Sequence, residues 1–177
     1  MCHKNEEKYI DLAKCEPVLE DTKDYLDSAS HLYTLIKLNN KGLPESMDHV
    51  FPYIVLSSYC IESGLKNILI IKKIAFPKDH NLKRLFNFLP QDVKDLIYFY
   101  PNMIWNSMVF QESVEACFKK CLAKAKNNFI EARYFFEKKN KKSTFCLPFL
   151  NDLSNCLYEL LLEIFREEEK NEKNTNN

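Results

Sequence analysis

Apolar residues recur every three or four positions through most of this chain, which is the spacing that gathers them on one face of an α-helix. A first stretch of this kind follows Pro17 and ends near Asn39, where an Asn-Asn-Lys-Gly run interrupts it. A second opens near Ser46 or Asp48, either of which could cap a helix, and continues to about Ala75. The Phe-Pro pair that follows favours the end of this helix. The pattern therefore predicts two amphipathic helices before residue 78.

Beyond residue 78 the stretches with helical spacing are first short and then longer. Two short helices are expected at 79–89 and 91–99, separated by Pro90. The longest uninterrupted pattern covers 110–136 and predicts a helix of more than seven turns. A last helix is expected from about Pro148 to residue 166. The stretch 103–110 is aromatic and apolar, and its pattern does not assign it to a helix or a strand.

These patterns predict an all-α fold, an up-down bundle of four to five long helices with short inserted helices. The chain has 177 residues, enough for one domain with a real core, and only two glycines, which disfavours the many tight turns of a sheet-rich fold. We expect a polar N-terminal segment at 1–15, a single bundle domain at 16–166 and a charged C-terminal tail at 167–177. Both terminal segments are expected to fray.

Charge is balanced over the whole chain but is unevenly distributed. The formal net charge is zero, whereas residues 119–142 carry nine Lys and Arg against two acids, a local net charge of +7. Residues 152–172 carry seven acids against two basic residues, a local net charge of −5. Such runs usually form solvated helix faces, and the alternative is a basic patch on one surface.

Seven cysteines occur without the spacing of a disulfide framework or a metal site. Cys117 and Cys121 would share one helix face, and we interpret them as small buried hydrophobic residues rather than metal ligands. The polar N-terminus lacks the pattern of a secretory signal, and the longest apolar run, 68–71, is too short to span a bilayer. We therefore expect a cytoplasmic protein with no membrane association, no metal and no cofactor.

Polar residues on the apolar stripes indicate where chemistry could lie, because burying them costs free energy unless they are paired. Glu62 lies close to the apolar stripe of the second helix, and Lys66 stands four residues later in reach of it. Arg133 lies at the edge of the long pattern and could pair with Glu137 or with Glu62. His80 opens the third helix and is interpreted either as a capping residue or as a proton donor or acceptor.

The order of these residues resembles the HEPN family. The run Glu-Ser-Gly-Leu-Lys at 62–66 precedes His-Asn-Leu at 80–82, and the run Phe-Ile-Glu-Ala-Arg-Tyr at 129–134 is followed by Glu137. The resemblance implies a four- or five-helix bundle that is often homodimeric and recurs in toxin–antitoxin, phage-defence and RNA-processing systems. Many members are metal-independent ribonucleases in which an arginine and a histidine, separated by four to six residues, act on RNA.

The sequence departs from that family pattern at its catalytic pair. No histidine occurs after His80, so Arg133 is not followed by the expected partner. Asn81 also stands where the family commonly has aspartate. Chemistry of the family's usual kind would have to use His80 from a different helix.

Three functions remain as hypotheses. The first is a non-catalytic HEPN-like module that binds RNA, a nucleotide or a protein partner such as an antitoxin. Its candidate nucleic-acid contacts are Lys66, Lys126, Arg133, Lys138 and Lys139. The second is a metal-independent endoribonuclease that uses Glu62, His80 and Arg133. The third is a structural oligomerisation bundle in which Glu62 and Arg133 form a buried pair.

Overall fold

The structure, a computed structural model, describes Tyr9 and residues 18–39, 44–101, 103, 112–126, 128–133 and 145–175. Its described elements are helical, which confirms the all-α class. They are α1 (Leu19–Leu35), α2 (Val50–Ile71), α3 (Leu82–Phe88), α4 (Gln91–Tyr98), α6 (Val114–Ala125), α7 (Asn128–Arg133) and α8 (Leu147–Thr175).

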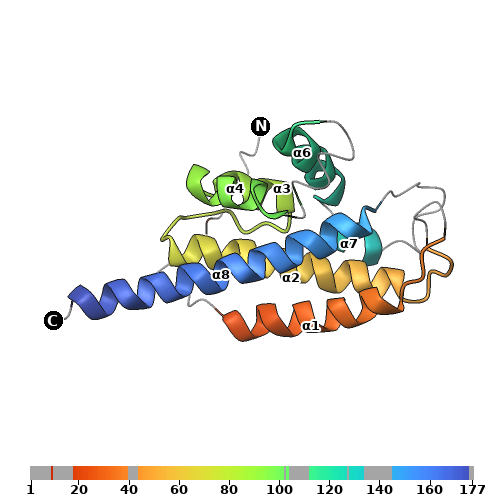
Figure 1. The fold of residues 1–177 in the computed structure, drawn as a ribbon, viewed down its shortest axis with the longest axis horizontal. Helices are drawn as coiled ribbons and strands as arrows, with labels where there is room; N and C mark the ends of the chain where they lie inside the picture. Colours follow the sequence, from red (N-terminus) through yellow and green to blue (C-terminus); the bar gives the residue numbers. More distant parts are fainter. Residues whose placement is uncertain are drawn as a thin grey trace, which may run out of the picture.

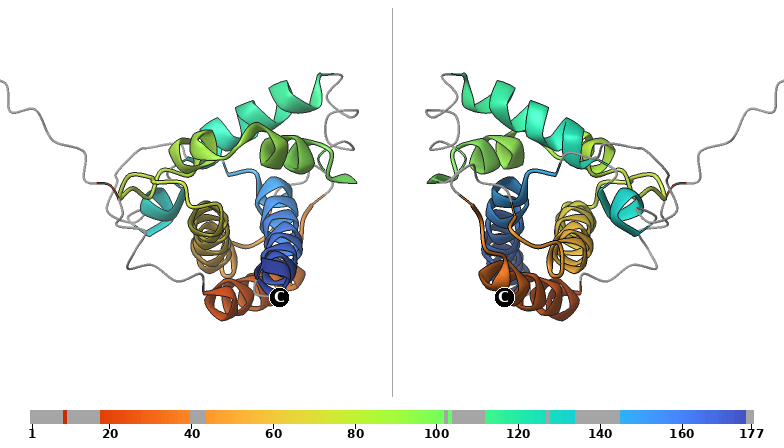
Figure 2. Two further views of the ribbon diagram at one scale, coloured as in Figure 1. Left: turned by 90° about the vertical axis from the view of Figure 1, so that its left-hand side faces the viewer. Right: turned by 90° about the vertical axis from the view of Figure 1, so that its right-hand side faces the viewer.

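The three longest of these helices, α1, α2 and α8, lie side by side along the molecule (Figure 1). In the end-on views of Figure 2 they occupy the corners of a triangle, with α3, α4 and α6 lying over the side formed by α2 and α8. Helix α7 lies on the flank of α2 that faces away from α8, and it packs against α2. Helix α2 is therefore in contact with α1 from the first half of the chain and with α7 and α8 from the second half.

Contacts between the helices give their relative directions. Val18 bonds to Asn67, near the end of α2, which makes α1 antiparallel to α2. The Tyr53 hydroxyl donates to the Leu147 carbonyl at 2.9 Å, and Lys72 lies 3.8 Å from Glu168, so α8 runs parallel to α2. The chain between α2 and α8 therefore returns along the length of the bundle.

Helix α2 is the centre of the core. Its side chains Ile54, Ile61, Leu65, Ile68 and Leu69 have no exposed surface. By length and hydropathy alone this helix could also cross a membrane, but most of its apolar window is buried against the other helices. Gly64 permits the close approach of α8, because a β-carbon there would lie 3.2 Å from the β-carbon of Leu157. Burial against the surrounding helices is what stabilises so apolar a segment in this fold.

Several helix boundaries differ from those predicted, and α1 and α2 each end about one turn earlier than expected. The helix expected at 110–136 is divided, since α6 ends at Ala125 and α7 begins at Asn128. The Lys126 carbonyl at this break accepts a hydrogen bond from the Leu82 backbone N–H at 3.1 Å, so tertiary contact with α3 accompanies the interruption. Helix α8 continues through Thr175, and the tail expected to fray from residue 167 is helical up to that residue. The Glu and Lys residues of this tail have good helix propensity.

Other sequence predictions lie outside the described residues. These are the N-terminal segment apart from Tyr9, the stretch 104–110, and residues 134–144 of the basic run. The proposed domain boundaries stay predictions.

Candidate functional site

A hydrogen-bonded turn fixes the backbone of His80. One carboxylate oxygen of Asp79, Oδ1, accepts from the backbone N–H groups of His80 at 2.7 Å and of Asn81 at 3.1 Å. Asn81 is the N-cap of α3, and its side chain accepts from the Arg84 backbone N–H at 3.0 Å. The Arg84 guanidinium returns to Asp79 Oδ2 at 3.3 Å. Asn81 thus provides the capping function for which short polar side chains are favoured.

Glu62 supplies a buried carboxylate beside this turn. It lies on α2 with 6% of its surface exposed. The Lys66 ammonium, one helical turn later, lies 2.5 Å from Glu62 Oε1. His80 Nδ1 lies 2.9 Å from the same oxygen and 3.1 Å from Oε2. The structure therefore brings Glu62, Lys66 and His80 into one cluster, and the carboxylate has the partners that its burial requires.

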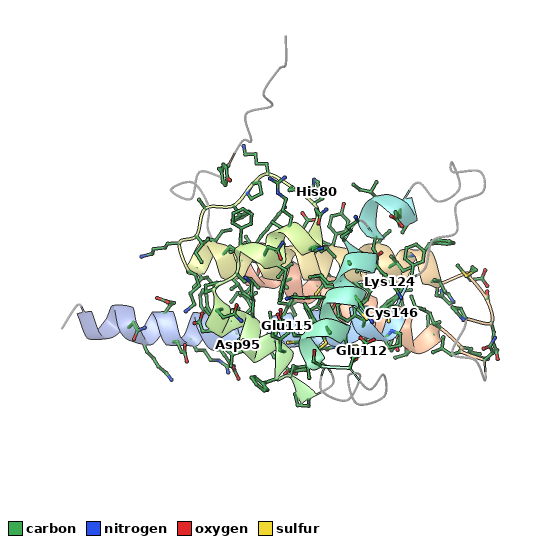
Figure 3. All side chains as sticks on the ribbon, turned by 90° about the horizontal axis from the view of Figure 1, so that it is seen from above. His80, Asp95, Glu112, Glu115, Lys124 and Cys146 are labelled. Atoms are coloured by element: carbon green, nitrogen blue, oxygen red, sulfur yellow. The ribbon has the colours of Figure 1, made fainter. Side chains whose placement is uncertain are left out.

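The contact with Glu62 determines how the imidazole of His80 is oriented. Carboxylate oxygens accept hydrogen bonds, so a proton on Nδ1 would be donated to Glu62, and this contact holds the ring in one orientation. The His80 side chain is 59% exposed, and Figure 3 labels it in the connection between α2 and α3, at the edge of the bundle. An imidazole can accept or release a proton, so His80 is a candidate for acid–base chemistry.

Arg133 is the last residue of α7, and α7 packs against α2, the helix that carries Glu62. Its side chain and Glu137 lie outside the described parts of the structure. The described partners of Glu62 are Lys66 and His80. The predicted convergence of Arg133 with Glu62 and His80 stays a prediction.

The structure describes only some of the candidate nucleic-acid contacts. Lys66 belongs to the cluster, and the backbone of Lys126 contacts α3 two residues after His80. Lys138 and Lys139 lie outside the described residues. The structure thus brings the vicinity of Lys126 to the His80 turn, although the two are far apart in the sequence.

A groove between α1 and α2 adjoins the cluster and was not anticipated from the sequence. It has a volume of about 290 Å³, and Glu62 and Lys66 form part of its lining. Two tyrosines also line it, Tyr25 from α1 and Tyr59 from α2, with ring centroids 5.3 Å apart and planes inclined by 18°. Asp21 adds a further carboxylate. The sequence of each helix does not show how α1 and α2 align with each other. The pairing of Tyr25 with Tyr59 could therefore not be predicted.

Within the described ranges no group of three His, Cys, Asp or Glu side chains is arranged to hold a metal ion. The cluster of Glu62, Lys66 and His80 contains a carboxylate, an ammonium and an imidazole, which is a set suited to binding anions and moving protons.

Comparison with known families identifies the fold. The family model described as HEPN domain matches residues 52–157, which include Glu62, Lys66, His80 and Arg133. No curated protein and no solved structure matches the chain significantly. The matched region extends from the start of α2 into α8 and covers more than half of the chain. This protein belongs to the HEPN domain family.

Proposed function

We propose that this HEPN domain binds RNA along the groove between α1 and α2 and the adjoining edge at His80. The observation that carries the proposal is the combination of an ammonium, an imidazole and a stacked tyrosine pair on one side of α2. Ammonium and imidazole N–H groups donate hydrogen bonds to phosphate oxygens, and tyrosine rings stack on nucleobases without requiring a particular base. The toxin–antitoxin and phage-defence settings implied by the family resemblance are consistent with such a module.

Lys66 is the residue expected to contact phosphate. Its ammonium has three donors, and the described contact with Glu62 uses one of them. The side chain is 25% exposed, so the remaining donors lie near the surface of the groove. Glu62 holds the ammonium in place, which reduces the conformational entropy lost when a ligand binds.

The test is fluorescence anisotropy with mixed-sequence RNA at about 50 mM and about 200 mM salt. We expect Lys66→Ala to weaken binding and to reduce the slope of log affinity against log salt by roughly one. The matched control is Lys23→Ala, which removes another lysine that pairs with an acid four residues away, Asp27, but lies outside the groove lining. Binding without salt dependence, or an equal loss in both variants, would contradict the proposal and favour a protein partner.

The stacked pair gives an independent arm of the same test. Tyr25→Ala and Tyr59→Ala should each lower RNA affinity by about 1–3 kcal/mol if a base stacks on the ring. Unlike Lys66→Ala, these changes should leave the salt slope unaltered, because neither tyrosine neutralises a phosphate.

A second candidate function, metal-independent RNA cleavage, is favoured by the contact between Glu62 and His80. His80 would take the proton of a ribose 2′-hydroxyl, and the resulting oxygen nucleophile would attack the neighbouring phosphorus and expel the 5′-oxygen, which takes a proton from solvent and leaves as a hydroxyl. This yields a 2′,3′-cyclic phosphate. Arg133 is the residue expected to stabilise the charged phosphorane.

Cleavage is tested with His80→Ala and Glu62→Gln on end-labelled RNA. We expect His80→Ala to abolish cleavage and to leave the far-UV circular dichroism intact, while Glu62→Gln lowers the rate by disturbing the orientation of the ring. Equal activity in His80→Ala, or no cleavage by the parent chain, would end this candidate while leaving RNA binding open.

The family resemblance also leads us to propose a homodimer in the cytoplasm. Light scattering coupled to gel filtration measures the mass of the particle directly. A monomeric mass at the concentrations used for RNA binding would contradict the homodimer without affecting the groove.

A further inference from the structure

Three thiols surround a small cavity between α6 and the start of α8, away from the cluster at His80. The cavity has a volume of about 100 Å³ and is lined by Cys117 and Cys121 of α6, by Cys146, and by the aromatic rings of Phe118 and Phe149. All three cysteines are free thiols. Cys117 is buried, whereas Cys121 and Cys146 are only partly buried. The cavity therefore places two partly accessible thiols at a common surface.

Cys146 occupies a position that favours its thiolate. It directly precedes α8, a helix of 29 residues, and the Phe149 backbone N–H donates to its sulfur. The hydrogen bond with the Cys121 thiol, this contact with Phe149 and the nearby Lys124 ammonium of α6 together lower the pKa of Cys146, against the opposing effects of burial and of Asp152. Figure 3 labels both Cys146 and Lys124. Helix N-termini and neighbouring cations are the environments in which cysteines become reactive.

Cys121 complements Cys146. Its thiol hydrogen-bonds to Cys146, and this contact, with burial, raises the pKa of Cys121. Within this pair, the Phe149 backbone N–H and the Lys124 ammonium favour the thiolate at Cys146. Cys117 is less suited to react first, because burial raises its pKa as well.

We propose that Cys146 is an oxidation-sensitive thiol and that Cys121 is its resolving partner, the two forming a reversible disulfide. The proposal does not rest on RNA binding or cleavage. The disulfide would join α6 to the residue before α8. The chain between the two cysteines, which includes α7 and Arg133, would then form a covalent loop.

The oxidant is a hydroperoxide, here hydrogen peroxide. The Cys146 thiolate attacks one oxygen, the O–O bond breaks, and hydroxide leaves, which gives a sulfenic acid on Cys146. The Cys121 sulfur then attacks the Cys146 sulfur, forming the S–S bond and expelling the hydroxyl group. The proton of the Cys121 thiol and one solvent proton convert the two hydroxides to water. Two sulfurs lose two electrons in total, and one peroxide gains them. A dithiol reductant reverses the oxidation.

The experiment treats the reduced full chain with hydrogen peroxide, blocks remaining thiols by alkylation, and maps the linked peptides by mass spectrometry. We expect a link between Cys121 and Cys146 that dithiothreitol reverses. In Cys121→Ser the sulfenic acid should accumulate on Cys146 and be trapped by dimedone, and Cys146→Ser should lose both products. The matched control Cys156→Ser removes a buried thiol of α8 and should leave the link unchanged.

A measurement on the unaltered chain keeps the proposal open to refutation if a variant fails to fold. Under native conditions near neutral pH, Cys146 should react with iodoacetamide at least roughly tenfold faster than Cys60 or Cys156. Burial raises the pKa of each of these two thiols to about 12. Equal alkylation rates, a disulfide that omits Cys146, or oxidation of Cys146 without a link to Cys121 would overturn the proposal.

Discussion

Replacing Asn67 with alanine should destabilise the protein, because this side chain joins the beginning of α1 to α2. Its Oδ1 accepts from the Val18 backbone N–H at 3.1 Å, and its Nδ2 donates to the Val18 carbonyl at 3.0 Å. The same Nδ2 lies 3.1 Å from Thr22 Oγ1 and 3.3 Å from Ser63 Oγ. Asn67 is only 5% exposed, so its side chain is held among these contacts inside the fold.

The size of the effect follows from which groups lose their partners. Thr22 and Ser63 keep a hydrogen bond to each other at 2.7 Å, so the loss falls mainly on the two contacts to Val18. Val18 is 45% exposed, and water can partly replace those contacts. A net contribution of about 1 kcal/mol for each hydrogen bond, with some added loss of packing, gives about 2–3 kcal/mol.

Urea unfolding followed by circular dichroism measures this difference. Asn155→Ala is the matched control, because Asn155 donates within its own helix, to the Asn151 carbonyl at 2.8 Å, and bonds to no other element among the described residues. We expect Asn155→Ala to cost less than about 1 kcal/mol. If Asn67→Ala lowers the free energy of unfolding by no more than the control does, at an unchanged m-value, the link between α1 and α2 does not stabilise the fold.

Three further changes test other parts of the core by the same unfolding assay. Gly64→Val should cost about 1–3 kcal/mol by overpacking against Leu157, and an unchanged midpoint would show that α8 can move away. Tyr53→Phe should cost about 1–2 kcal/mol, because it removes the donor to the Leu147 carbonyl; full stability would show that this bond is replaced. The free energy of unfolding should fall as the pH rises above about 9, because the Cys156 thiol has a pKa of about 8.5 in the unfolded chain. Burial raises its folded pKa to about 12, so its contribution is complete below the unfolded pKa and is lost towards the folded one. Cys156→Ala should flatten this decline, and an identical pH profile would assign it to other groups.

The helical class and family were predictable because each depends on local information. The stripe through Ile54, Ile61 and Leu65 marks α2 as a core helix in whatever direction its neighbours run. The break between α6 and α7 was not predictable in this way. The apolar spacing continues across it, while the contact from Leu82 to the carbonyl of Lys126 is made only in the folded chain.

The candidate site was predictable in its members but not in its pairing. Glu62 was singled out as a polar residue near an apolar stripe, and Lys66 as its neighbour one turn away. The pairing of Arg133 with Glu62 stays a prediction, and the structure places His80 against the carboxylate. The path of the connection between α2 and α3 decides this pairing, and no local pattern encodes that path. The groove between α1 and α2 was missed for the same reason.

The parallel arrangement of α2 and α8 has a consequence for synthesis on the ribosome. Helix α2 emerges long before α8, and until residue 147 follows, the α8 side chains that cover α2 are not yet present. During that interval the nascent chain presents a segment with the length and hydropathy of a membrane span and without its main cover from the C-terminal half. Early pairing with α1, which precedes α2 in the chain, shields one flank of this segment. Pairing with α1 thus covers part of this apolar segment before α8 is synthesised.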